Sequence, residues 1–274
     1  MKYKCLSIAG FDGSGGAGLQ ADLKTFSAFG CYGMTVLTAL PVQNTCGIRS
    51  CYHIPVHSIQ EQMETIFEDI MPDSIKIGML FSCEIVECVA NTLKKYAKDI
   101  PIVLDPVMVA KSGDPLLLDE AVEALKSKLI PLASIITPNL PEAYKLVENK
   151  VKSMKKLAKE LLTFGSDAVL VKGGHLQKHT SDDIYFDKSG AKVWLKSIRI
   201  DSKNTHGTGC TLSAAICAGL ALGLPMIDAC QLAKQYLSQA IKAAQYNSVG
   251  KGHGPVHHFY HLWPTLNKIK ENLK

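Results

Sequence analysis

Two glycine-rich segments carry residue types that could bind phosphate or a small ring. The first, GFDGSGGAG at residues 10–18, contains Gly13, Gly15 and Gly18 in the spacing G-x-G-x-x-G, which often holds a dinucleotide pyrophosphate. A dinucleotide site also needs an acidic residue at the end of the second strand, and this sequence has Gln43 there. Two interpretations remain: a tight strand–helix turn, or close approach of the backbone to a small substrate.

The second glycine-rich segment, NTHGTGCTLSAA, begins at residue 204 and leads into a pattern of small residues typical of a helix. Backbone N–H groups and the helix dipole at such a start stabilise an oxyanion or a transferring phosphoryl group. The same field predicts a lowered thiol pKa for Cys210. The alternative is a helix that needs small residues only for packing. Because G-K-[ST] occurs nowhere, the segment favours a phosphotransferase without a Walker loop.

Three charged side chains follow the ends of predicted strands. Asp105 ends an apolar run, Glu142 follows TPNLP in the next strand–loop unit, and Lys172 ends a further strand. Mg²⁺ prefers a few carboxylates with water and phosphate oxygens, and a lysine can pair with phosphate. Each side chain alone could form a structural ion pair, but together at one sheet edge they indicate a site for magnesium and phosphate.

The elements that must position these residues alternate between short apolar runs and helical patterns. The predicted strands are 5–9, 35–40, 74–79, 102–105, 134–137 and 168–172. The predicted helices are 19–30, 57–70, 83–98, 119–130, 151–163, 211–222 and 226–246. This alternation predicts an α/β fold, a mostly parallel, doubly wound sheet with helices on both faces. Residues 181–200 predict an antiparallel hairpin at its edge, and the chain reads as one domain over residues 1–274.

Composition limits the classes of protein that fit. The chain has 274 residues, 47% of them hydrophobic, and a net charge of +5. It contains no apolar run of about eighteen residues and no signal-peptide pattern at its start, so we expect a cytoplasmic protein without a membrane span. The lysine-rich stretch at 148–162 indicates a solvated helix face rather than a nucleic-acid surface, because no aromatic residues lie between the lysines.

Cysteines and histidines are numerous enough to raise the question of a metal site. The nine cysteines are spread along the chain without a C-x-x-C motif, so most should be reduced, buried small residues. HHFYH at residues 257–261 places three histidines close together. A metal site there would need further ligands with suitable geometry.

Longer motifs identify the chain as similar to a known family. SIAGFDGSGGAGLQAD, PVQNTCG, KIGML, LDPVMVAKSGDPLL, ITPNLPEA, VLVKGGH, NTHGTGCTLSAA and VGKGHGPVHH occur in this order over nearly the whole chain. They resemble the bacterial hydroxymethylpyrimidine/phosphomethylpyrimidine kinases of thiamine biosynthesis, which belong to the ribokinase-like superfamily. The resemblance implies transfer of phosphate from ATP to 4-amino-5-hydroxymethyl-2-methylpyrimidine and then to its monophosphate.

The resemblance also implies a role for individual residues. The family's pyrimidine pocket falls on Gly10, Ala17, Asp22, Gln43, Met79, Val107 and Cys210. Its anion hole corresponds to Gly207, Thr208, Gly209 and Cys210, with Cys210 as the catalytic base and Lys172 beside the phosphate. Asn139, Lys172 and Thr208 are the predicted nucleotide-binding residues, and Asp105 and Glu142 are the predicted ligands of Mg²⁺.

Some points stay open at the level of sequence. A pyridoxal kinase of the same superfamily is the alternative enzyme, and Gln43 argues against it, because an amide can both donate to and accept from an aminopyrimidine. A pyrimidine-binding protein without catalysis is a second alternative. The presence of Cys210, Asp105, Glu142 and Lys172 argues against it.

Phe11 replaces the Ser or Thr usual in similar sequences and could cap the pocket or pack outside it. Similar enzymes are often dimers, so we expect a homodimer, with apolar residues 31–56 as an interface or a lid.

Overall fold

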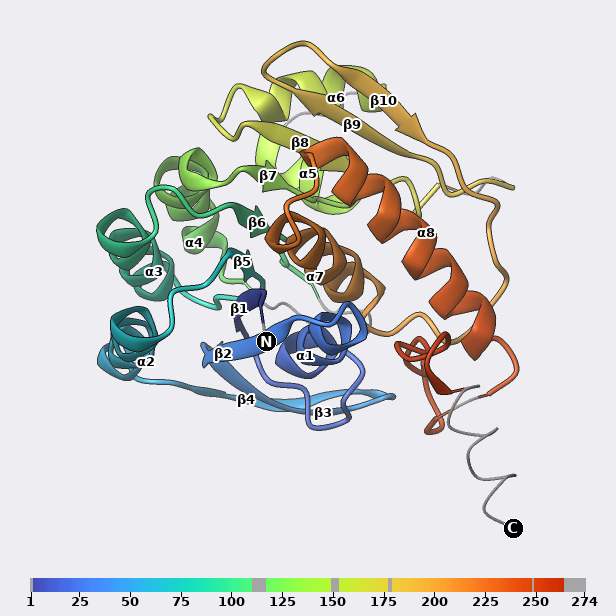
Figure 1. The fold of residues 1–274 in the computed structure, drawn as a ribbon, viewed down its shortest axis with the longest axis horizontal. Helices are drawn as coiled ribbons and strands as arrows, with labels where there is room; N and C mark the ends of the chain where they lie inside the picture. Colours follow the sequence, from blue (N-terminus) through green and yellow to red (C-terminus); the bar gives the residue numbers. More distant parts are fainter. Residues whose placement is uncertain (1, 110–116, 149–152, 177–178, 248, 264–274) are drawn as a thin grey trace.

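The computed structural model describes residues 2–109, 117–148, 153–176, 179–247 and 249–263, and shows a central sheet between two helical layers (Figure 1). The sheet has eight strands in the order β10-β9-β8-β7-β6-β5-β1-β2. The bounds are β1 Lys4–Ala9, β2 Tyr32–Leu37, β5 Ser74–Ile77, β6 Ile102–Leu104, β7 Ile135–Ile136, β8 Ala168–Val171, β9 Asp183–Asp187 and β10 Lys192–Leu195. Strands β1 to β8 of this sheet are parallel, and β9 and β10 are antiparallel to their neighbours.

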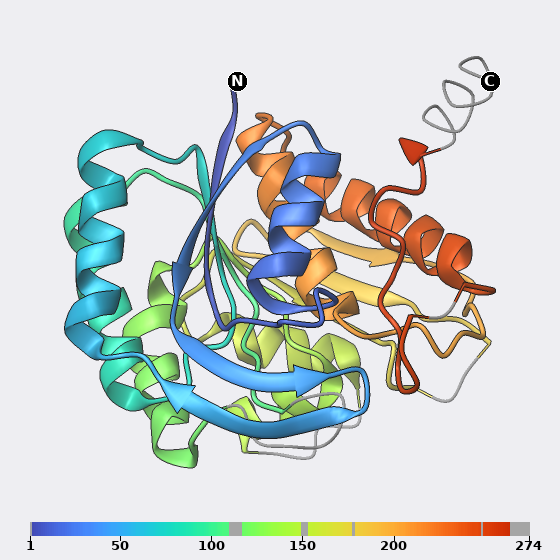
Figure 2. The ribbon, with the colours of Figure 1, turned by 90° about the horizontal axis from the view of Figure 1, so that it is seen from below.

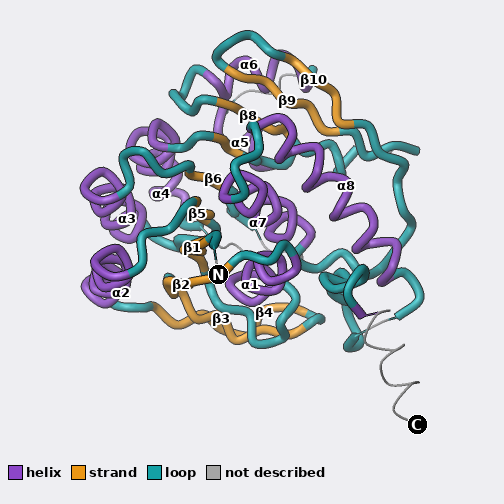
Figure 3. The backbone as a smooth tube through the Cα atoms, in the orientation of Figure 1, coloured by secondary structure: helices purple, strands orange, loops and turns teal. Residues whose placement is uncertain are grey.

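Helices cover both faces of the sheet, as Figure 3 shows in purple. One layer holds α1 Gly18–Ala28, α7 Thr208–Ala221 and α8 Met226–Ala244, in which α7 packs against both α1 and α8. The other holds α2 Val56–Asp69, α3 Cys83–Tyr96, α4 Asp119–Ala124, α5 Leu140–Val147 and α6 Met154–Leu162. Each layer buries its own apolar cluster against the sheet, which accounts for the almost continuous apolar character of the parallel strands.

A separate two-stranded sheet lies along one edge of the molecule. It consists of β3 Ala39–Asn44 and β4 Gly47–His53, which pair antiparallel. Figure 2 shows this hairpin crossing below the point where β1 runs into its loop, at the carboxyl edge of the parallel strands. The hairpin therefore reaches over the place where ligands bind in open α/β sheets.

Most predicted elements are confirmed, including the mostly parallel sheet, the helices on both faces and the hairpin at 181–200, which forms β9 and β10. Two predicted elements differ, and two observed elements, helix α5 and strand β4, were not predicted. The predicted strand at 35–40 spans the break between β2 and β3. The predicted helix 119–130 leaves α-helical geometry after Ala124, continuing as a π-helical turn Leu125–Leu129 and a 3₁₀ turn Ile130–Leu132. Residues 151–152 of another predicted helix lie outside the described residues, and one domain over residues 1–274 stays a prediction.

Candidate active site

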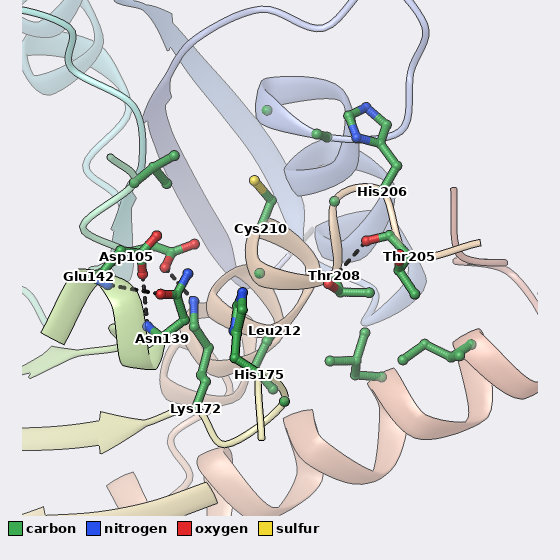
Figure 4. Close-up of a pocket in the computed structure, with 18 of the residues that line it drawn as sticks. Asp105, Asn139, Glu142, Lys172, His175, Thr205, His206, Thr208, Cys210 and Leu212 are labelled. Atoms are coloured by element: carbon green, nitrogen blue, oxygen red, sulfur yellow. Dashed lines mark hydrogen bonds and ion pairs between the residues drawn. The ribbon is translucent and has the colours of Figure 1, made fainter. Parts of the chain in front are cut away.

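A cavity of about 500 Å³ lies at the carboxyl edge of the parallel strands. Figure 4 shows the cavity wall, with Asp105, Asn139, Glu142 and Lys172 together on one side of Cys210 and His206 on the other. The predicted site residues that line it are Gly10, Ala17, Gln43, Met79, Asp105, Val107, Asn139, Glu142, Lys172, Gly207, Thr208, Gly209 and Cys210. Asp22 does not line the cavity. The structure thus brings both glycine-rich segments and the charged strand ends to one place.

The loop between β1 and α1 is organised around the carboxylate of Asp12, which is fully buried. Its Oδ1 accepts hydrogen bonds from the Ser14 amide at 2.9 Å and hydroxyl at 2.7 Å. Its Oδ2 accepts from the amides of Gly16 at 3.0 Å and Ala17 at 2.7 Å, and lies 2.8 Å from His206 Nε2. Burial alone would raise the pKa of Asp12, but the hydrogen bonds from His206 and Ser14 lower it to about 2.

The two glycine-rich segments touch each other through their backbones. Gly207 has φ +74°, and a Cβ added there would overlap the carbonyl oxygen of Gly16. A Cβ on Gly16 would in turn overlap the His206 ring. Glycine is therefore required at both positions, once for the left-handed backbone and once for the close approach.

Cys210 lies in the first turn of α7, and the amide of Gly18 at the start of α1 favours the charged form of its sulfur. The starts of two helices therefore converge on this sulfur. On its other side, a Cβ on Gly209 would lie 3.4 Å from both Asp105 Oδ2 and Lys172 Nζ, so the backbone of α7 passes beside these two charges. This is where a phosphoryl group could reach both the helix amides and a cation.

The expected lowering of the Cys210 pKa is wrong. Burial raises the pKa of the thiol to about 11; Lys76 and the Gly18 amide lower it, whereas Asp22 and Asp105 raise it further. Removal of the sulfur from water, together with two nearby carboxylates, thus outweighs the favourable field at the helix start. The thiol is therefore protonated at pH 7.

Sequence reasoning missed Lys76, a fully buried lysine on β5 that lines the cavity. Its Nζ lies 2.7 Å from Asp22 Oδ2, and Asp22 also accepts from the Ser7 hydroxyl at 2.5 Å. Burial lowers the pKa of Lys76, but Asp22 and Cys210 raise it above its ordinary value. Asp22 therefore lies beneath the cavity and holds a cation in its floor.

Asp105 and Lys172 form the charged side of the cavity. Lys172 Nζ lies 2.8 Å from Asp105 Oδ1, which also accepts from the Thr137 hydroxyl at 3.2 Å. Asp105 is almost fully buried, as expected of a carboxylate at the end of a parallel strand with a cationic partner. Nearby, Asn139 pairs with Lys172 as an isolated β-bridge, which places the start of α5 at the same edge.

Glu142 and Asn139 also form a capping box at the start of α5. The Glu142 carboxylate accepts from the Asn139 amide at 2.8 Å, and the Asn139 side chain accepts from the Glu142 amide at 3.0 Å. This N-x-x-E spacing is the signal by which α5 could have been found in the sequence. Burial raises the pKa of Glu142 to about 7; Lys172 lowers it and Asp105 raises it.

The charge balance of this side suits a divalent cation. Two buried carboxylates, Asp105 and Glu142, face one lysine, so an excess of negative charge remains when both ionise. No group of three His, Cys, Asp or Glu side chains able to hold a metal occurs within the described residues. Two carboxylates with phosphate oxygens and water fit Mg²⁺, which rarely has an all-protein cage.

Gln43 reaches the cavity from β3. Its Nε2 donates to the Phe11 carbonyl oxygen at 3.2 Å, which orients the amide. Phe11 itself lines the cavity and is partly buried, so it lies at the pocket wall rather than outside it. Both residues belong to the segments predicted to contact a ring.

The remaining cysteines and histidines have ordinary structural roles. All nine cysteines are described and are free thiols. His257 packs on Trp263, His258 Nε2 lies 3.1 Å from the Thr211 hydroxyl, and His261 contacts the Ala28 carbonyl. The three histidine side chains therefore contact different partners and do not converge on one site. None of the helices over the described residues is long and apolar enough to cross a bilayer.

Comparison with known proteins decides which family the chain belongs to. The model of the phosphomethylpyrimidine kinase family matches residues 12–257. The chain belongs to this family. It is 47% identical over 262 residues to a hydroxymethylpyrimidine/phosphomethylpyrimidine kinase of Rhizobium meliloti (strain 1021), covering 94% of this chain and 97% of that protein. It is 46% identical to a thiamine biosynthesis bifunctional protein of Geobacter sulfurreducens, covering 92% of this chain and 51% of that protein.

A solved structure shares the fold of this kinase. The ADP complex of a Bacillus subtilis pyridoxal kinase superimposes with a TM-score of 0.85 at 38% identity, covering 94% of this chain and 98% of that one. The ribokinase-like fold and the kinase activity expected from the sequence are confirmed. Lys76 and His206, which the sequence did not single out, also line the cavity, and His206 contacts the buried Asp12.

Proposed function

We propose that the protein transfers the γ-phosphoryl group of ATP to 4-amino-5-hydroxymethyl-2-methylpyrimidine. A second transfer, to the resulting monophosphate, gives the pyrophosphate used in thiamine biosynthesis, and both reactions take place in the cytoplasm. One observation carries the proposal: Gln43, Cys210 and the Asp105–Lys172 pair line a single cavity. A group that recognises an aminopyrimidine therefore faces the same volume as the groups that suit a phosphate.

Recognition of the ring rests on Gln43 and the first glycine-rich segment. Since the Gln43 Nε2 donates to the Phe11 carbonyl, the amide oxygen is the atom that accepts from the exocyclic amine of the substrate. A Cβ on Gly10 would lie 2.9 Å from Met79 Sδ, so the backbone and the thioether are close-packed at the wall. Such a wall suits a flat ring.

Transfer then needs mainly positioning. The substrate hydroxymethyl oxygen attacks the γ-phosphorus, the bond to the β–γ bridging oxygen breaks, and ADP leaves. The amides of Gly207, Thr208 and Gly209 and the Lys172 ammonium stabilise the equatorial oxygens of the moving group. Holding acceptor and phosphate in line supplies most of the acceleration.

Cys210 is the proposed acceptor of the hydroxymethyl proton. Because its pKa is about 11, the sulfur must become more acidic when ATP and the acceptor bind. Neutralising the Asp105 charge removes one of the influences that raise this pKa. Late proton transfer also suits a loose transition state, in which the attacking oxygen needs little activation.

Mg²⁺ is the proposed cofactor, with Asp105 and Glu142 as the residues that would hold it. Bound with ATP, it would neutralise charge on the phosphate oxygens. The raised pKa of Glu142, about 7, supports the assignment, because a carboxylate that is costly to ionise alone favours a cation beside it.

Steady-state kinetics with three acceptors test the proposed function. We expect the pyrimidine alcohol and its monophosphate to be phosphorylated with larger kcat/KM than pyridoxal. A larger kcat/KM for pyridoxal would overturn the substrate assignment.

The variant Cys210→Ala tests the role of the thiol. It should bind the pyrimidine yet lose most turnover, and an unchanged kcat would show that Cys210 is not the proton acceptor.

Phosphorylation of pyridoxal is the second candidate activity. The 38% identity to the Bacillus subtilis pyridoxal kinase over nearly the whole chain favours it as a side activity. Both acceptors present a hydroxymethyl group on a six-membered ring. Competition between them in one assay shows whether they share the cavity.

A homodimer is the proposed assembly. Four apolar side chains at the hairpin edge of the molecule are exposed: Tyr32, Val42, Tyr52 and Val56. Their position on β2, the β3–β4 hairpin and the start of α2 supports an interface there. Light scattering after size-exclusion chromatography measures the mass, and a value of one chain would contradict the dimer.

A further inference from the structure

The contact between the two glycine-rich segments contains a hydrogen-bonded pair, His206 and Asp12, that the proposed chemistry does not use. His206 Nε2 lies 2.8 Å from Asp12 Oδ2, with the two side chains 13% and 0% exposed. These residues are 194 positions apart in the chain, so the contact is specific to the fold. His206 directly precedes Gly207, the left-handed residue that starts α7.

Asp12 is placed so that it can set the shape of the acceptor loop. The same Oδ2 atom that meets His206 accepts from the amides of Gly16 and Ala17, and Ala17 lines the cavity. A shift of the carboxylate would therefore move the loop wall that faces the ring. Through its hydrogen bond to Asp12, the imidazole connects the loop between β1 and α1 to the first turn of α7. Cys210 and the phosphate-facing amides lie in that turn.

His206 is fixed from its other side as well. Its backbone amide donates to the Gly254 carbonyl at 3.0 Å, and the residue forms a bridge with Pro255. A Cβ on Gly16 would lie 3.1 Å from Pro255, so loop, histidine and C-terminal segment are packed together without spare room. The backbone that carries the imidazole is therefore held in place by the C-terminal segment.

We propose that His206 is a positioning residue that, through Asp12, holds the acceptor loop in register with the start of α7. The proposal rests on the proposed function, since it concerns the alignment of the acceptor oxygen with the γ-phosphoryl group. Loss of this link displaces the acceptor relative to the phosphate, while the Mg-ATP side formed by Asp105, Glu142 and Lys172 stays intact.

Two substitutions test whether the hydrogen bond to Asp12 matters, or only the presence of a polar side chain at position 206. In His206→Gln the side-chain amide extends far enough to donate to Asp12 in place of Nε2. In His206→Asn the amide stops one bond short and cannot. We expect the asparagine variant to lose about 10- to 100-fold in kcat for transfer to the pyrimidine, because a misplacement of about 1 Å can cost this much. The glutamine variant should stay close to the wild type.

A second measurement separates positioning from stability. The ratio of ADP formed to pyrimidine phosphorylated should rise in His206→Asn, because a misaligned acceptor lets water compete for the phosphoryl group. The affinity for Mg-ATP, measured by calorimetry, should not change. A variant that was only unstable would lose both activities together and keep the ratio of the wild type.

Asp187→Asn is the matched control. Asp187 organises the turn after β9 in a similar way, since it accepts from the Ser189 amide and hydroxyl and from the Ala191 amide, but it lies outside the cavity. The Asp187→Asn variant should leave the ratio of ADP formed to pyrimidine phosphorylated unchanged. Equal kcat and equal ADP-to-product ratios in His206→Asn and the wild type would overturn the proposal. The wild-type rate on the pyrimidine tests the proposed function separately, and the comparison of variants uses whichever acceptor the wild type phosphorylates.

Discussion

At the scale of single residues, the charge state of Cys210 depends on its surroundings more than on its helix. Lys76 and the Gly18 amide favour the thiolate, but burial and the carboxylates Asp22 and Asp105 disfavour it more strongly. A sequence shows that a cysteine starts a helix. It does not show how much water the sulfur loses or which carboxylates lie beneath it, and for that reason the predicted direction of the pKa was wrong.

Alkylation by iodoacetamide measures this directly. The thiolate is the reactive form and exists above the pKa, so Cys210 in the unliganded protein should react slowly at pH 7 to 8 and faster toward pH 11. At pH 8 only about one thiol in a thousand is ionised. Site-resolved mass spectrometry follows the modification, with the exposed Cys46 as an internal control. A rate that levels off below pH 8 would contradict the raised pKa.

Gln43 should decide which acceptor is preferred. In Gln43→Met the amide oxygen is lost at similar volume, and the exocyclic amine of the pyrimidine is left without its acceptor. We expect kcat/KM for the pyrimidine to fall about 10- to 100-fold, corresponding to the roughly 1–3 kcal/mol of an unpaired buried polar group. The value for pyridoxal should change much less. Gln60→Met on the exposed face of α2 is the control, and equal losses for both acceptors would argue against a role in specificity.

At the scale of elements, the carboxyl edge of the sheet was predictable because several strands run into polar residues, among them Asp105 after β6 and Lys172 after β8. The role of Lys76 was not predictable, because in the sequence it is a single lysine within a strand. Its partner Asp22 lies 54 positions away on α1. Helix α5 is hard to predict because it has only eight residues and contains Pro141, and because Asn139 and Glu142 of its capping box also suit a ligand site. The β3–β4 hairpin was missed because its alternation runs on from β2 with a single residue, Thr38, between the strands.

The hairpin that carries Gln43 is held at its tip by the C-terminal segment. The Thr45 carbonyl accepts from the His253 amide at 2.9 Å, and its hydroxyl accepts from the Gly252 amide at 3.2 Å. A Cβ on Gly252 would overlap the Thr45 carbonyl. The position of Gln43 over the cavity thus depends on residues more than 200 positions later in the chain.

Gly252→Ala should therefore act on the acceptor side alone. The added methyl group pushes the hairpin tip away, so we expect KM for the pyrimidine to rise several-fold while KM for ATP stays unchanged. Gly190→Ala places alanine at φ +90° in the β9–β10 turn, away from the cavity, and controls for backbone strain. Parallel rises in both KM values would show that the segment supports the whole fold rather than the hairpin.

At the scale of the whole molecule, buried titratable groups link stability to pH. His258 is 4% exposed, and burial lowers its pKa to about 3, with the charges of Lys24 and His257 acting in the same direction. The unfolded chain binds a proton near pH 6.5, but the folded protein does not. This group therefore makes the free energy of unfolding fall as pH drops below about 6.5.

Urea unfolding at pH 7 and pH 5 measures the effect. We expect His258 to account for about 2 kcal/mol of the decrease in the free energy of unfolding between these values. His258→Gln keeps a polar partner for Thr211 and cannot be protonated, so its decrease should be smaller by this amount. His261→Gln, on the exposed side of the same segment, should behave like the wild type. The same decrease in all three proteins would show that His258 carries a charge in the folded state.

The backbone contact between Gly16 and Gly207 restricts where new substrate preferences can arise. Neither loop accepts even a methyl group at these positions, so mutation there removes activity before it can alter selectivity. Pro41 and Gln43 enter the same cavity from a two-stranded sheet outside the main one, where a side chain can change without moving the phosphate-facing amides. Divergence toward other hydroxymethyl rings should accumulate in that hairpin, and a saturation library limited to it should recover more altered specificities than one aimed at the glycines.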